Sequence, residues 1–447
     1  MIYCSTVNDL IILKVYSHKW IRGDNTMTQS EENAHEKFTL KYYVRDAVRN
    51  TPQKEFIWCL NFATEAHKEQ KRKDLEKTPY INHPIGVAYI LAEEAGLSNV
   101  DLLQGCLLHD TVEDTELTSE VIRAKLGDFI GNLVDEVTDD KSLPKQKRKD
   151  LQVVHARSTS PAGKLVKMAD KLYNLRDLER QLPEGWSEQR RSEYFEWAFQ
   201  VCEGLRGISP KLEEQLDVIF VKRGLITKRE QSESKFSPPW PNHDELKPLL
   251  AAANFAAIKH RQHFMFDDSS NVPYINHLVS TTFHVSQDAD VEETSVLCAA
   301  LLKDVVGKGT TSFEEVKEQF GEEVESFVKE LTYNHSLPVN EQIKLQIDRA
   351  PTLSHHAKVV VLAAMVDACR RLEVCQPETM TETEREEYFR LSQRLSEVIS
   401  GTDSVLEEDL QLIWVGQGLK EFPMKSNEEP RDLGKNSIFG KNKNSFL

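Results

Sequence analysis

A histidine and three carboxylates gather in one short stretch of the chain, LLHDTVEDT at residues 107–115. If this stretch is helical, His109/Glu113 and Asp110/Asp114 are both i,i+4 pairs. One helix would then present an imidazole and three carboxylates towards neighbouring parts of a single site. The alternative is a helix end at which His109 packs on the core and the acids face water.

Together with His83 and Asp170 from other segments, residues of this stretch could form a metal site. A divalent metal that activates water for phosphoester cleavage needs a few N/O ligands and at least one open position. His83, His109, Asp110 and Asp170 offer two imidazoles and two carboxylates, and each lies beside apolar sequence from which it can point inward. This mixture favours Mn²⁺, Fe²⁺ or Zn²⁺ over Ca²⁺ and Mg²⁺, which prefer oxygen ligands.

Other residues around these ligands suit catalysis and substrate binding. Glu113 and Asp114 follow the His-Asp pair by one turn and could orient the attacking water or shuttle its proton. Asn174 is four residues after Asp170 and would face the same pocket. The basic run at residues 71–73 suits phosphate groups, although a solvated loop would have the same composition.

Composition limits the class of protein. The chain has 447 residues, 39% hydrophobic and 29% charged, and a formal net charge of −16. A net charge of this sign argues against nucleic acid as a partner, so basic groups for an anionic substrate must be concentrated locally. The seven cysteines form no CxxC motif, which indicates a reducing, cytoplasmic location, and no stretch is suited to a membrane span.

Hydrophobic periodicity predicts an all-α fold without a series of strands. Asn82 before Pro84 suits a helix start, and a polar, basic connection is expected at residues 139–150. Further helices are expected at residues 85–95, 100–110, 119–126, 130–137, 187–205 and 210–221, and around residues 166–178. We expect a poorly ordered leader at 1–50, a first domain at 51–225, a proline-rich linker at 226–243, a second domain at 244–420 and a disordered tail at 421–447.

The second domain repeats the first. PYINH occurs at residues 79–83 and 273–277, LLHD at 107–110 matches LLKD at 301–304, and EYF occurs at 193–195 and 387–389. Each pair is separated by 194 residues, so the repeat runs without a gap between these segments. The offset is one residue shorter before them, since His67 matches His260, which places one inserted residue in the loop between.

Three motifs of the first repeat carry a family resemblance. INHP, LLHDTVEDT and VKMADKLYNLRDL, in this order and spacing, resemble the HD-type hydrolase domain of RelA/SpoT proteins, above all the stand-alone metazoan SpoT-homolog hydrolases. The resemblance covers residues 51–225 and implies a compact all-α HD domain in which one Mn²⁺ serves pyrophosphohydrolysis of guanosine 3′,5′-bis(diphosphate). Some animal members also remove the 2′-phosphate of NADPH. The resemblance assigns the metal to His83, His109, Asp110 and Asp170, catalysis to Glu113 and Asp114, and substrate contacts to Arg72, Lys73, Asn174 and Tyr194.

The second repeat lacks most of these groups. His277 and Asp304 remain, but Lys303 stands for His109 and Ala364 for Asp170, so divalent binding should be lost. Asp367 aligns with Tyr173 and is out of register to act as a ligand. The acids become Gly307 and Lys308, Asn174 becomes Ala368, and the basic run becomes Phe264-Met265-Phe266, while the apolar skeleton is kept. We expect a folded pseudo-hydrolase whose Phe-Met-Phe segment either contacts the first repeat or another protein, or packs locally.

The sequence therefore predicts a metal-dependent hydrolase that removes the 3′-pyrophosphate of guanosine 3′,5′-bis(diphosphate)-type nucleotides. An NADPH 2′-phosphatase using the same site is the alternative within enzymes. A regulatory or assembly protein acting through the second repeat is the alternative outside them. The expected ligand is a small phosphorylated nucleotide, with no nucleic acid or membrane as a partner and with a possible contact between the two repeats.

Overall fold

The computed structural model describes residues 51–229, 236–266, 272–309, 311–333, 336–374 and 376–419. Throughout this part of the chain the regular structure is helical, and extended pairing is limited to two isolated bridges, Lys71 with Pro79 and Phe264 with Pro273. The all-α prediction is thus confirmed. No helix in the described part combines the length and the apolarity needed to cross a membrane. The predicted leader and tail lie outside the described residues.

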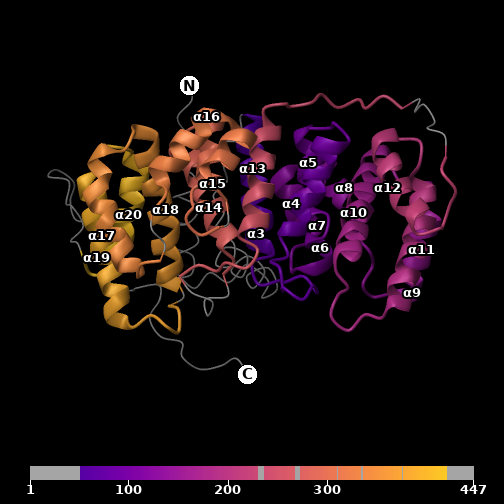
Figure 1. Cartoon of the computed structure of the whole chain (residues 1–447), viewed down its shortest axis with the longest axis horizontal. Coiled ribbons are helices and arrows are strands. Elements are labelled where there is room, and N and C mark those ends of the chain that lie inside the picture. The colour runs from indigo at the N-terminus through magenta and orange to yellow at the C-terminus, as the bar shows by residue number, and fades with distance from the viewer. Residues whose placement is uncertain are drawn as a thin grey trace, which may run out of the picture. The chain divides into compact units, whose positions relative to one another are not determined.

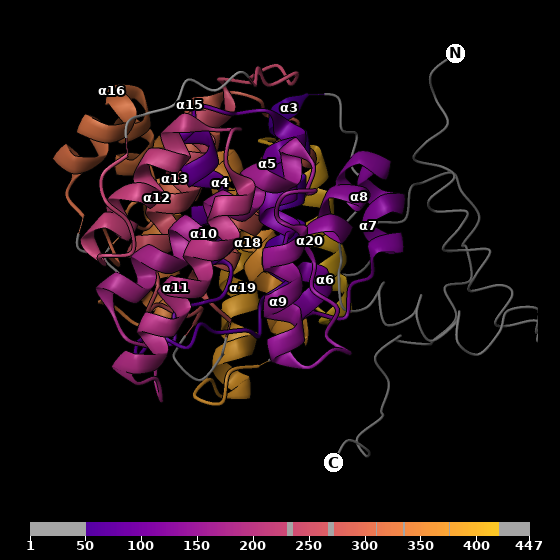
Figure 2. The same cartoon turned by 90° about the vertical axis from the view of Figure 1, so that its right-hand side faces the viewer.

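The first repeat is built around one long helix, α10, which runs from Pro161 to Arg180. Its other helices are α3 (Pro52–Ala66), α4 (Asn82–Tyr89) with a π-helical turn (Ile90–Glu94), α5 (Val100–Leu108), α6 (Thr111–Asp114), α7 (Ser119–Leu126), α8 (Asp128–Val137), α9 (Lys145–His155), α11 (Glu188–Leu205) and α12 (Pro210–Lys222). Figure 2 looks onto this repeat and shows α10 between α11 and α12 on one side and α5 and α8 on the other, in agreement with its contacts.

The second repeat follows the same order of helices. It comprises α13 (Leu246–Lys259), α14 (Tyr274–Gln287), α15 (Thr294–Leu302), α16 (Phe313–Leu331), α17 (Val339–Arg349) with a 3₁₀ turn (Ala350–Thr352), α18 (His355–Val374), α19 (Glu382–Val398) and α20 (Ser404–Gly416). Helix α18 takes the place of α10 and contacts α14, α15, α16, α19 and α20 (Figure 1). The internal repeat seen in the sequence is therefore a repeat of structure.

Local signals explain where the helices begin. Ser160 at the start of α10 accepts a hydrogen bond from Gly163 N, and Pro161 occupies the first turn, where its missing N–H costs nothing. Helix α11 is capped in the same way by Ser187, and α12 by Ser209. Along α10 the buried apolar residues recur at three- and four-residue spacing, which holds this helix in the core.

One predicted connection is partly helical. Residues 139–150 were expected to form a polar loop, yet α9 begins at Lys145. Helix α9 has no buried residue, so its sequence lacks the apolar stripe from which a helix is normally recognised. Its contacts with α11 keep it in place, and Trp197 on α11 donates a hydrogen bond to the carbonyl of Lys149 (3.1 Å).

The two repeats contact each other through equivalent helices. Helix α3 packs on α14, and α4 packs on α13. The buried side chain of Asn82 donates to the carbonyl of Ala257 (2.7 Å), and that of Asn276 donates to the carbonyl of Thr64 (3.1 Å). Since Asn276 matches Asn82 and Ala257 matches Thr64, the two hydrogen bonds are counterparts. The arrangement is that of a symmetric dimer interface, here within one chain.

The end of the segment expected to be a linker is fixed on the first repeat. Asn242 accepts a hydrogen bond from Ser98 N (2.9 Å), and His243 Nδ1 accepts one from Val100 N (3.1 Å). Asn99 donates to the carbonyl of Pro241 (3.0 Å). The chain is thus held at the start of α5 before it enters the second repeat.

Candidate metal centre and substrate pocket

The stretch LLHDTVEDT does not form one continuous helix. Helix α5 ends at Leu108, His109 and Asp110 form a turn, and the four-residue helix α6 starts at Thr111. The hydroxyl of Thr111 donates to the carbonyl of Leu108 (2.6 Å), which closes this turn. His109 and Glu113 therefore do not lie one turn apart on a single helix, as a continuous helix would require. The turn still directs His109 inward, where its side chain is 5% exposed.

The four predicted metal ligands meet at this turn. Nε2 of His83, on α4, lies 3.4 Å from Oδ2 of Asp110 and 3.2 Å from Oδ1 of Asp170, on α10. Nε2 of His109 lies 3.1 Å from Oδ2 of Asp110 and 3.8 Å from Oδ1 of Asp170. Ligand atoms of His83, His109 and Asp170 all lie within 4.8 Å of one another.

The state of these side chains fits a bound cation. Nδ1 of His109 lies 2.7 Å from the carbonyl of Cys106, and donation there leaves the lone pair on Nε2, which is buried and makes no hydrogen bond. Burial alone would raise the pKa of Asp110 and of Asp170. The pKa of Asp110 is held well below its usual range chiefly by His109, and that of Asp170 by Lys171. Despite burial, the same two carboxylates raise the pKa of His109 to about 9, so a bound cation would take the place of a proton on its Nε2. Two anionic carboxylates and two imidazole nitrogens form a donor set for Mn²⁺, Fe²⁺ or Zn²⁺.

Further hydrogen bonds orient the carboxylates. The hydroxyl of Tyr80 donates to Asp110 (2.6 Å) and to Asp114 (2.9 Å), and so joins a predicted ligand to a predicted catalytic acid. The side-chain amide of Asn174 donates to Asp170 (2.5 Å). Tyr80 was not predicted as a site residue, although it belongs to the repeated PYINH motif.

The two predicted catalytic acids lie beside the ligands and contact cations. Oε1 of Glu113 lies 3.1 Å from Arg148, and Oδ1 of Asp114 lies 2.5 Å from Lys141. Burial, followed by repulsion from Asp110 and other nearby carboxylates, raises the pKa of Glu113 to about 7. A carboxyl group that titrates near neutrality can both accept and release a proton during a reaction.

A pocket of about 460 Å³ opens next to this centre. All four residues that the resemblance assigns to substrate line it, namely Arg72, Lys73, Asn174 and Tyr194. Arg72 donates to the side-chain oxygen of Asn174 (2.8 Å) and to Asp177 (3.2 Å). Sequence reasoning missed Trp186 and Arg180, which also line the pocket and follow the last recognised motif.

Basic side chains gather beside the pocket. Lys145 and Lys149 lie on α9, and Lys167 lies on α10. Burial lowers the pKa of each of these lysines, and neighbouring cations lower it further. The charged neighbours of Lys145 are Arg190, Lys73 and Arg148, which concentrates positive charge next to the pocket residue Lys73 in a chain of net charge −16. The sequence did not single out these lysines, because the segment that carries most of them was taken for a connection.

The second repeat arranges the matching positions differently. Nδ1 of His277 lies 2.7 Å from Asp367, and Asp304 accepts a hydrogen bond from Tyr274 (2.5 Å) and pairs with Lys303. Within the described ranges, the only group of three or more potential ligands able to hold a metal is the one in the first repeat.

The Phe-Met-Phe segment contacts both repeats. Met265 is buried, and Phe266 packs edge to face against Tyr388 (5.9 Å between ring centroids). The ammonium group of Lys71, in the first repeat, lies 4.8 Å from the centre of the Phe264 ring. Both predictions for this segment thus apply, to different residues: Phe264 contacts the first repeat, and Met265 and Phe266 pack locally.

Comparison with known proteins agrees with this geometry. A family model described as HD domain matches residues 59–195 and 252–391. The chain is 59% identical over 165 residues to a protein of Xenopus tropicalis named guanosine-3′,5′-bis(diphosphate) 3′-pyrophosphohydrolase MESH1, a match that covers 37% of this chain and 92% of that protein. The human protein of that name is 59% identical over 171 residues (38% and 96%), and the Drosophila melanogaster protein is 48% identical over 175 residues (39% and 98%). These relatives match the first repeat and are about as long as one repeat. This chain therefore belongs to the HD-domain family, and its first repeat belongs to the metazoan SpoT-homolog branch of that family.

Proposed function

We propose that the first repeat is a metal-dependent hydrolase that removes the 3′-pyrophosphate group of guanosine 3′,5′-bis(diphosphate)-type nucleotides. The observation that carries this proposal is the convergence of four N/O donors with two acids at the edge of a cationic pocket. The likeness to the named pyrophosphohydrolases, which extends over nearly their whole length, supports the same reaction.

His83, His109, Asp110 and Asp170 would hold one divalent cation, for which we propose Mn²⁺, with Zn²⁺ or Fe²⁺ as competitors. When bound, the cation supplies Lewis-acid activation of water and neutralises charge on the phosphoryl group. Tyr80 and Asn174 keep the two carboxylates turned towards the imidazoles through their hydrogen bonds.

Glu113 is the group best suited to move protons. Its carboxylate can take a proton from the attacking water and return it to the leaving oxygen, because its pKa lies near 7 in the protein. The hydroxyl of Tyr80 bonds both Asp110 and Asp114, and so keeps the second acid, Asp114, at a fixed distance from the ligands.

Arg72, Lys73 and the lysines of α9 would bind the phosphate groups of the substrate. Arg72 is positioned by Asn174 and Asp177, so its guanidinium group is preorganised rather than free to rotate. The ring of Tyr194 lies at the wall of the pocket near Trp186 (5.9 Å between centroids), where it could pack against the base or the ribose. We also propose a cytoplasmic location, since the cysteines within the described residues are buried thiols.

The test is an assay of the full chain with Mn²⁺ on guanosine 3′,5′-bis(diphosphate), on its 5′-triphosphate counterpart and on NADPH. Asp170→Ala should remove activity, and Asp150→Ala, at an exposed carboxylate that bonds only Gln146, should keep it. A higher kcat/KM for phosphate release from NADPH would favour the 2′-phosphatase alternative. If no substrate were cleaved in a metal-dependent way, the chain would be a regulatory or assembly protein instead.

A further inference from the structure

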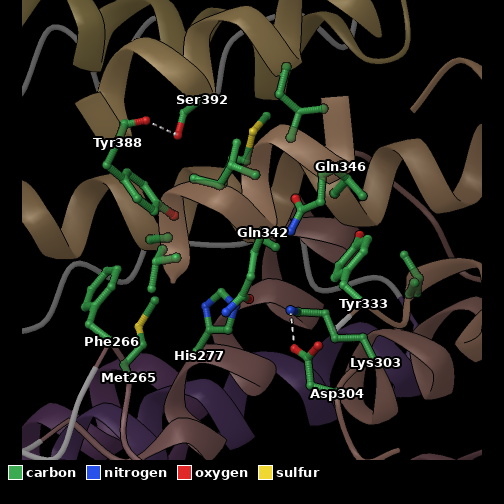
Figure 3. A pocket seen from close by; sticks show the side chains of 18 of the residues that line it. Met265, Phe266, His277, Lys303, Asp304, Tyr333, Gln342, Gln346, Tyr388 and Ser392 are labelled. Atoms are coloured by element: carbon green, nitrogen blue, oxygen red, sulfur yellow. Dashed lines mark hydrogen bonds and ion pairs between the residues drawn. The ribbon is translucent and has the colours of Figure 1, made fainter. Parts of the chain in front are cut away.

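The second repeat keeps a pocket where the first has its metal centre and substrate pocket. This pocket has a volume of about 350 Å³. Figure 3 shows side chains of several helices and of the Phe-Met-Phe segment pointing into it. His277, Lys303, Asp304 and Tyr388 line it from positions equivalent to His83, His109, Asp110 and Tyr194. Loss of the catalytic groups was therefore not accompanied by filling of the site.

The second pocket has apolar side chains at positions where the first repeat carries lysines. At the constant offset of 194 residues, four lysines of the first repeat become Val339, Ile343, Val361 and Met365, all of which line the pocket. Ala364 and Ala368 replace Asp170 and Asn174, and these shorter side chains leave room at the centre. A wall of this kind cannot hold several phosphate groups, but it suits an apolar body.

One cationic group has no carboxylate bonded to it among the described residues, although Asp304 lies near enough to raise its pKa. Lys303 pairs with Asp304, which also accepts the hydroxyl of Tyr274. The ammonium group of Lys308, in contrast, lies 3.8 Å from the centre of the Tyr274 ring, and no carboxylate of the described residues forms an ion pair with it. Burial lowers its pKa to about 8. A partly buried ammonium group at the wall of a pocket is a site for one anionic group.

The backbone at the wall is strained. Phe266 has a φ angle of +62°, a conformation that bulky residues rarely adopt. Its ring lines the pocket and packs edge to face against Tyr388, which also lines it. Strain of this kind persists where the surrounding structure fixes it, most often at ligand sites.

From these observations we infer that the second repeat binds a small apolar monocarboxylate. The carboxylate would pair with Lys308, in a pocket to which Tyr333 and Gln342 contribute further polar groups. The apolar body would lie against Met265, Phe266 and Met365. A single negative charge matches Lys308, because the other lysine of this wall, Lys303, already pairs with Asp304.

Calorimetric titration of the full chain with octanoate and with 2-naphthoate tests this inference, because the two probes share the carboxylate and differ in the shape of the body. At least one of them should bind saturably at one site per chain. Lys308→Met should weaken that binding about tenfold or more, as expected for loss of a charge-assisted contact. Lys317→Met is the matched control: it removes an exposed lysine outside the pocket and should change nothing.

Two further comparisons separate the site from non-specific binding. Octanol, which lacks the charge, should bind Lys308→Met and the unaltered chain alike. Ala364→Leu should fill the centre of the pocket and remove binding of every probe. Hydrolysis by the first repeat, measured in the same variant, shows whether the chain remains folded. Absence of saturable binding by both carboxylates, or equal affinity of Lys308→Met and Lys317→Met, would overturn the inference.

Discussion

Asp367 holds Nδ1 of His277 at 2.7 Å, from the helical position at which the first repeat carries Tyr173. Arg371 also bonds this carboxylate, and together with His277 it keeps the pKa of Asp367 below the usual range despite burial. The pairing uses Nδ1 of His277, whereas His83 turns Nε2 towards the carboxylates of the first repeat. His277 thus keeps the position of a ligand, and the second repeat lacks two of the other ligands, at Lys303 and Ala364.

Restoring the missing ligands alone should not create a metal centre. We expect the Lys303→His/Ala364→Asp chain to bind one divalent ion per chain, the number expected of the unaltered chain, because the ammonium group of Lys308, at the position of Asp114, stays near Asp304 and repels a second cation there. Metal content after dialysis, determined by plasma mass spectrometry, checks this. A second ion in the double variant would show that the charge of Lys308 does not exclude a metal. The same count in Asp170→Ala should fall to zero.

Glu113 should set the acidic limb of the pH profile. Its raised pKa means that the carboxylate is protonated as the pH falls through about 7, so kcat/KM should decline on the acidic side if Glu113 accepts a proton. A bound cation favours the carboxylate and would move this limb to lower pH. Glu113→Gln should lower kcat by about 100-fold or more and abolish the limb. Persistence of an unchanged limb in this variant would assign it to another group.

The lysines of α9 should attract the substrate at long range. We expect Lys145→Gln/Lys149→Gln to lower kcat/KM by about tenfold at low ionic strength, and by less in high salt, since salt screens such attraction. Steady-state kinetics at two salt concentrations measure the effect. The charge-matched control is Lys317→Gln/Lys344→Gln in the second repeat, which should leave kcat/KM unchanged at both.

His260 should make the fold sensitive to mild acid. Burial lowers its pKa to about 3, so it stays neutral in the folded protein while the unfolded chain binds a proton below pH 6.5. The free energy of unfolding should therefore fall by about 1 kcal/mol between pH 7.5 and 5.5 through this group. Denaturant titrations at both pH values should show a smaller fall in His260→Asn than in the exposed control His355→Asn. Equal falls would remove His260 as the cause.

The two asparagines between the repeats should contribute alike to stability. Asn82→Ala and Asn276→Ala each leave one buried carbonyl without its donor, and each should lower the free energy of unfolding by about 1–3 kcal/mol. Only Asn82→Ala should also reduce hydrolysis, because Asn82 precedes the predicted ligand His83. Thermal unfolding and activity of the two variants, measured side by side, test both statements.

Sequence reasoning found the fold because its signals are local and repeated. Helix α12 starts at Pro210 after the capping Ser209, as sequence preferences indicate, and α4 starts at the expected Asn82 although no side chain caps it. The constant offset of 194 residues revealed the second domain. The predicted metal ligands come from motifs of fixed spacing, and the structure brings three of them within 4.8 Å of one another. Helix α9 was not found, since a helix without a buried face leaves no periodic pattern.

Contacts between distant segments could not be read from the sequence. The hydroxyl of Tyr80 reaches Asp110 across 30 residues, and its place in a motif does not reveal which polar atom it meets. The pairing of Asp367 with His277 depends on which way an imidazole ring is turned, a choice that packing settles. The turn at His109 likewise depends on tertiary packing, because the stretch around it reads equally well as a helix.

The packing of α3 on α14 and of α4 on α13 keeps the two repeats together even when the protein is dilute. A pair of separate subunits joined by such faces would come apart as the protein became scarce. Here the partner face is tethered by the connecting segment, so its effective concentration is fixed by the chain and not by the amount of protein. The first repeat therefore keeps its neighbour even when only a few molecules are present.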